Sequence, residues 1–167
     1  MDIPHYFDAQ TLAAIAAVGA LLTALVNYGQ GRIAARMHTA QLYLEFSARY
    51  NAPEIAAALT ALADWRKKQG DNFAQVFHAK FLEQDAEAVQ INFHRRTLNR
   101  YFLDVAQAYR ARVLNKRFAR LAADHPGAAI WRQVVVPMNM LQYQETDSAT
   151  LRTLMRVVPH FGERSVF

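Results

Sequence analysis

The stretch Leu-Ala-Ala-Ile-Ala-Ala-Val-Gly-Ala-Leu-Leu-Thr-Ala-Leu-Val, residues 12–26, holds no charged residue and only one polar side chain, that of Thr23. Extended to residues 11–28, it approaches the shortest helix that crosses a hydrocarbon core of about 30 Å. We therefore expect residues 11–28 to form a single transmembrane helix. Two alternatives stay open, a cleaved signal peptide and a buried helix of a soluble protein. A signal peptide normally starts with positive charge, whereas this chain starts with Asp2 and Asp8.

Charged residues are distributed unequally before and after this stretch. Residues 1–31 contain two acidic residues and no Lys or Arg, and all 19 Lys and Arg residues follow, beginning with Arg32 and Arg36. Basic residues close to a membrane helix are enriched on its cytoplasmic side. We therefore expect an inner-membrane, single-pass protein with its N-terminus outside, residues 1–31 as the anchor, and residues 32–167 as a cytoplasmic domain.

One face of the expected membrane helix is lined by small side chains. Their spacing of three or four residues places five of them on the same side: Ala13, Ala17, Ala20, Ala24 and Asn27. In lipid, small residues let two helices approach closely, and an asparagine can donate a hydrogen bond across the interface. The face predicts packing against other membrane subunits or a second copy of the chain. Equally, the alanines could reflect composition alone.

Helical periodicity continues after the anchor and predicts an all-α protein with a small helical bundle. No proline interrupts residues 8–49, so we expect one long helix there, continuous with the anchor. Breaks are expected at Gly70 and at residues 125–127, and the longest later helix is expected at about residues 84–114. Pro137 should kink or end the helix that holds it. Four residues are expected to cap helix N-termini: Asn51, Asp71, Asn115 and Asp147.

The residues that most reactions need are missing or scattered. The chain has no cysteine, which excludes disulfides, thiolate metal sites and cysteine nucleophiles, and it has neither a glycine-rich phosphate loop nor a Glu-x-x-His pair. His78 and His94 each follow a phenylalanine and could meet on a metal or haem. We favour the alternative that they lie at the edge of an aromatic core. We therefore expect no enzyme, no cofactor and no metal.

Residues 95–120 are strongly basic, because their only acidic residue is Asp104. The eight basic residues of this expected basic face are Arg95, Arg96, Arg100, Arg110, Arg112, Lys116, Arg117 and Arg120. Three interpretations compete: a solvated surface, a surface for anionic headgroups or an acidic partner, and a nucleic-acid surface. The aromatic residues between them have the spacing of a core, so we regard nucleic acid as the weakest of the three.

The chain resembles a broad group of uncharacterised bacterial single-pass membrane proteins with an N-terminal anchor and a helical cytoplasmic domain. Three segments carry the resemblance, and they cover an Arg-rich helix, a Leu-Asn core and a Trp-containing helix: Arg95-Arg96-Thr97-Leu98-Asn99-Arg100-Tyr101-Phe102, Val113-Leu114-Asn115 and Ile130-Trp131-Arg132. The resemblance implies the same architecture and no catalytic residues.

From these patterns we expect a membrane-anchored, non-catalytic interaction protein that serves as an accessory or structural subunit of a membrane complex. Its partners would be other membrane subunits or itself. The alternative is a peripheral or soluble helical module that binds nucleic acid or anionic lipid through the basic face.

Overall fold

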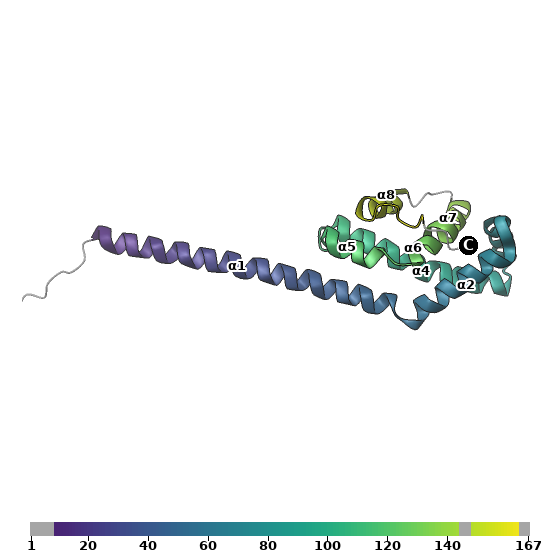
Figure 1. Cartoon of the computed structure of the whole chain (residues 1–167), viewed down its shortest axis with the longest axis horizontal. Helices are drawn as coiled ribbons and strands as arrows, with labels where there is room; N and C mark the ends of the chain where they lie inside the picture. Colours follow the sequence, from purple (N-terminus) through teal and green to yellow (C-terminus); the bar gives the residue numbers. More distant parts are fainter. Residues whose placement is uncertain (1–8, 144–147, 164–167) are drawn as a thin grey trace, which may run out of the picture. The chain divides into compact units, whose positions relative to one another are not determined.

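The computed structural model describes residues 9–143 and 148–163, apart from the side chains of residues 9–12, 15, 143 and 148. Within these ranges the regular structure is helical and includes no strand, which confirms the expected all-α class (Figure 1). The α-helices are α1 (Ala9–Tyr50), α2 (Pro53–Gln69), α3 (Phe73–Leu82), α4 (Ala86–Arg110), α5 (Lys116–Ala123), α6 (Gly127–Ile130), α7 (Val136–Tyr143) and α8 (Ser148–Val157). A short 3-10 turn, η1 (Gly70–Asn72), and a π-helical turn, η2 (Trp131–Val135), complete the set.

The chain divides after His38 into two compact units, and α1 contributes to both. In the first unit the described residues form a single helix with no other element. The predicted boundary after residue 31 falls within this unit. The long helix expected from the absence of proline is confirmed, and it continues through Gly29 and Gly31 without interruption.

No helix in the described part of the chain is both long enough and apolar enough to cross a membrane. The structure therefore does not support the transmembrane anchor expected at residues 11–28. The side chains of Thr11, Leu12 and Ile15, which belong to that expected span, lie outside the described residues.

Helix α4 runs through the centre of the second unit, where it packs against α2, α3, α5 and α8. Its apolar residues recur every three or four positions, and Leu98, Phe102 and Val105 are fully buried. The ring of Phe102 lies 5.6 Å from the rings of both Trp131 and Phe161. This aromatic cluster ties the middle of α4 to η2 and to the turn after α8.

The last turns of α1 belong to the second unit and are held there by Tyr50. Its hydroxyl oxygen accepts a hydrogen bond from the backbone N–H of Gly127 (3.1 Å), and its ring stacks on His125 at 4.0 Å. A β-carbon at Gly127 would lie 2.9 Å from both the Tyr50 hydroxyl and a methyl group of Leu59. Glycine at the expected break is therefore required by the close approach of α1 and α2.

Two expected helix caps are wrong. Pro53 already supplies the preorganised first position of α2, so the N-cap is Ala52, and the side chain of Asn51 instead donates to the carbonyl of Ser47. Asp71 does not cap α3, because it lies in η1 and pairs with Arg66 at 2.8 Å.

A third expected cap is confirmed, since Asn115 accepts a hydrogen bond from the N–H of Phe118 and starts α5. The cap of α4 is Asp85, which accepts from the N–H of Ala88 and delays the helix start to Ala86. Asp147 lies outside the described residues.

The π-helical turn η2 precedes Pro137. Here the N–H of Val136 donates to the carbonyl of Trp131, five residues earlier. Proline has no N–H, and in an α-helix its ring would clash with the carbonyl four residues before it. The wider turn accommodates this and keeps Trp131, Val134 and Val135 buried. The predicted interruption at Pro137 thus takes the form of a changed helical turn.

Candidate functional site

The first candidate site is the apolar surface of α1 in the first unit. The small face, which consists of Ala13, Ala17, Ala20, Ala24 and Asn27, is exposed along its whole length. Larger side chains cover the rest of the helix surface and are between 56% and 63% exposed: Val18, Leu21, Leu22, Leu25 and Val26. A lone helix cannot bury its own side chains, so the first unit by itself leaves this apolar surface uncovered.

The hydroxyl of Thr23 forms its hydrogen bond within the helix. The hydroxyl of Thr23 donates to the carbonyl of Gly19 at 2.9 Å, which leaves its hydroxyl proton in no need of water. At the end of the apolar stretch, the guanidinium of Arg32 lies 5.7 Å from the centre of the exposed Tyr28 ring. Tyr28 and Arg32 thus combine apolar and polar groups where the apolar segment ends.

Arg95 is not part of the expected basic face, which corrects the sequence prediction. It is 1% exposed and lies in the core of the second unit. Its guanidinium donates to the side-chain oxygens of Asn92 and Asn139, and it lies 5.9 Å from the ring of Phe77. These contacts identify Arg95 as a residue that joins α4 to α3 and α7.

Arg96 and Arg100 are exposed on α4 as expected. Asp104 accepts a hydrogen bond from Arg49 of α1 at 2.6 Å and lies 4.0 Å from Arg100. Asp104, the single carboxylate of residues 95–120, therefore contacts two arginines. Its shorter contact, with Arg49, holds the end of α1 on α4.

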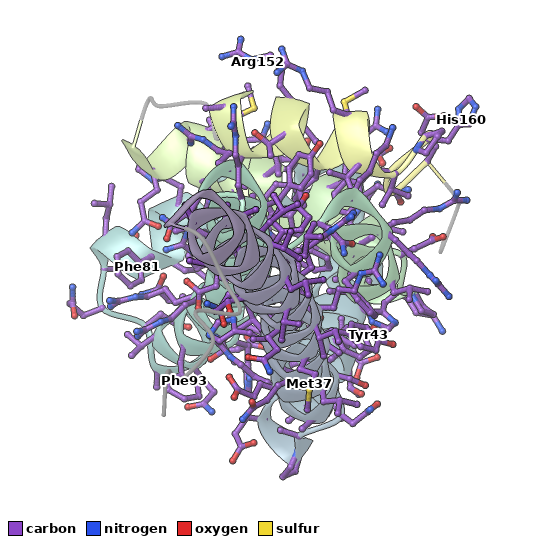
Figure 2. All side chains as sticks on the ribbon, turned by 90° about the vertical axis from the view of Figure 1, so that its left-hand side faces the viewer. Met37, Tyr43, Phe81, Phe93, Arg152 and His160 are labelled. Atoms are coloured by element: carbon purple, nitrogen blue, oxygen red, sulfur yellow. The ribbon has the colours of Figure 1, made fainter. Side chains whose placement is uncertain are left out.

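The remaining basic residues are exposed at the end of α4 and on α5: Arg110, Arg112, Lys116, Arg117 and Arg120. Helix α8 packs against both of these helices and adds two more exposed arginines, Arg152 and Arg156, with Arg152 pointing outward in Figure 2. Sequence analysis missed this pair, although its four-residue spacing on a helix whose other side holds the buried Leu154 and Val157 indicates a common exposed face.

His78 and His94 are both half-buried, on α3 and α4. The Nδ1 atoms of His78 and His94 are buried, and no hydrogen-bond partner for either lies in the described part of the chain. Burial lowers the pKa of His94. Burial also lowers the pKa of His125, and the nearby Asp124 carboxylate opposes this effect. Among the described residues, no three His, Asp or Glu side chains come together as metal ligands. Metal-free function stays a prediction.

No protein-family model, no curated protein and no solved structure matches this chain. The resemblance to bacterial single-pass proteins therefore stays an expectation.

Proposed function

We propose that this chain is a membrane-anchored, non-catalytic interaction protein, an accessory or structural subunit of a larger membrane complex. One observation carries the proposal: the described residues of the first unit form a single helix, and its uncharged stretch at residues 13–28 exposes apolar side chains. Burying each large side chain is worth about 1.5–3 kcal/mol. Lipid covers such a surface completely, and the internal hydrogen bond of Thr23 leaves no hydroxyl proton to be solvated there.

In this proposal the second unit lies on the cytoplasmic side of the inner membrane. The supporting feature is the distribution of charge. Arg32 and Arg36 follow the apolar segment, whereas Asp2 and Asp8 precede it and no Lys or Arg does. The small face of α1 then packs against a membrane helix of another subunit or of a second copy.

Extraction of membranes with alkaline carbonate tests the anchor, and the parent chain should stay in the pellet. Leu21→Arg places a charge in the middle of the apolar segment and should shift insertion by on the order of a hundredfold, with the variant moving to the supernatant. Leu82→Arg is the matched control, because Leu82 is an exposed residue of α3 in the second unit. Recovery of the parent chain in the supernatant would refute the anchor. Protease added to the outer face of the same membranes should spare the second unit.

Enlarging the small face tests the interaction. Ala17→Leu combined with Ala20→Leu should insert at least as well as the parent, since leucine is favoured in hydrocarbon. Because helix association in lipid depends on close packing, partners or a second copy should be lost on purification in mild detergent. Val18→Leu, on the opposite side, is the control. Equal recovery of partners with both variants would mean that the small face contacts only lipid.

A further inference from the structure

The end of α4, the turn that follows it and one side of α8 line an open basic pocket of about 530 Å³. We name it the arginine pocket, and its lining consists of Tyr109, Arg110, Arg112, Leu114, Asn115, Thr153 and Arg156. Among residues 9–143 and 148–163, no acidic residue lines this pocket, and none of its three arginines forms an ion pair. Three like charges around one cavity repel one another unless an anion lies between them.

Arg112 owes its place to an unusual backbone conformation. It has a φ of +59°, in the left-handed region that glycine adopts most readily, and it stands at the position after the helix end where glycine is common. Its N–H donates to the carbonyl of Tyr109 (3.0 Å), and the N–H of Val113 donates to that of Ala108 (3.1 Å). An arginine here gives up the conformational advantage of glycine, and it places a guanidinium at the pocket.

The three arginines and Asn115 supply the hydrogen-bond donors that a ligand would meet, and backbone acceptors at the end of α4 are already occupied. The carbonyls of Gln107, Ala108 and Tyr109 at the end of α4 already accept from backbone N–H groups, which reduces the repulsion of an anion. Asn115 uses its Oδ1 atom to cap α5, so its amide N–H groups stay free to donate. Thr153 already donates its hydroxyl proton to the carbonyl of Ala149 at 2.7 Å.

We propose that the arginine pocket binds one phosphate group. A guanidinium group can donate two parallel hydrogen bonds to a phosphate group. Asn115, the N-cap residue of α5, also places the N-terminus of that helix at the pocket, and helix N-termini favour anions. The phosphate comes either from a soluble phosphate compound or from the headgroup of an anionic phospholipid. This inference does not depend on the proposed membrane anchor, because every lining residue belongs to the second unit.

Isothermal titration calorimetry of the full chain in zwitterionic detergent at low salt tests the pocket. Inorganic phosphate is the soluble probe, and dihexanoyl phosphatidylglycerol, with dihexanoyl phosphatidylcholine beside it, is the lipid probe. We expect saturable one-to-one binding of at least one anionic probe. Binding of inorganic phosphate would assign a soluble ligand, and binding of phosphatidylglycerol alone would assign a lipid headgroup.

Three variants decide whether binding occurs at the proposed site. Arg112→Gly and Arg156→Gln should each weaken it by roughly tenfold, as expected for a lost hydrogen bond between charged groups. Glycine suits the left-handed position, so Arg112→Gly should melt at the same temperature as the parent or higher, which separates lost binding from unfolding. Arg96→Gln, an equal loss of charge on the exposed side of α4, should bind like the parent.

Three results would overturn the proposal. The first is an absence of saturable binding by either anionic probe. The second is an equal loss of affinity in Arg96→Gln and Arg112→Gly, which would mean a general charge effect. The third is equal binding of the two lipids, which would mean that the net negative charge of the headgroup is not recognised.

Discussion

Replacing Phe161 by alanine is expected to lower the free energy of unfolding by about 3–5 kcal/mol, the range for removing a buried phenylalanine. Phe161 is 1% exposed and packs edge-to-face on both Phe102 and Trp131. The backbone beside it packs closely against α6. Gly162 has a φ of +66°, and its β-position already lies 2.6 Å from the carbonyl oxygen of Ala128.

Phe93→Ala is the matched control for this variant. The Phe93 ring is 58% exposed, and it points away from the helices in Figure 2. The same chemical change there should alter stability by no more than about 0.5 kcal/mol. Urea denaturation of the full chain, followed by circular dichroism, measures both variants. Equal midpoints for the two would contradict the central role of the aromatic cluster.

Arg95→Ala is expected to lower the free energy of unfolding by about 2–5 kcal/mol, the combined effect of an emptied buried site and of two asparagine side chains that lose this donor. It removes a buried side chain, opens a void next to Phe77, and takes the guanidinium donors away from the side-chain oxygens of Asn92 and Asn139. Arg95→Lys should recover only part of the loss, because an ammonium group cannot reproduce the planar fork that bonds both asparagines.

Arg96→Ala controls for loss of charge at the neighbouring position. Arg96 is exposed, so its removal should change the free energy of unfolding by less than about 0.5 kcal/mol. The same denaturation measurement applies. If both alanine variants unfold at the same urea concentration, Arg95 does not have the structural role assigned here.

The helices of this chain are predictable from local physics, and their ends are less so. The periodic apolar face of α4 located the helix between residues 84 and 114, and the structure has it from Ala86 to Arg110. The ends moved because Asp85 accepts the first hydrogen bond and Arg112 adopts a left-handed turn. Asn51 failed as a cap because Pro53 determines where α2 begins.

The basic face shows what grouping residues by charge alone leaves out. Arg95 lies on the same face of α4 as Ile91, Leu98 and Phe102. The spacing therefore indicated that Arg95 is buried, although arginine usually lies at the surface. The sequence did not predict that Arg156 and Arg112 lie at the same pocket. They come together because α8 packs on α4, and no short-range pattern contains that packing.

The π-helical turn η2 also determines how this helix would respond to the loss of one residue. An α-helix closes each turn over four residues and a π-helix over five, so η2 contains one residue more than a regular helix would need. Deleting one residue between Trp131 and Val135 would restore α-helical geometry, and Met138 and Asn139 would keep their places in the core. The ring of Pro137 would then meet the carbonyl four residues before it, a clash that the wider turn avoids. We therefore expect such a deletion to destabilise the helix at Pro137 and not to rotate α7.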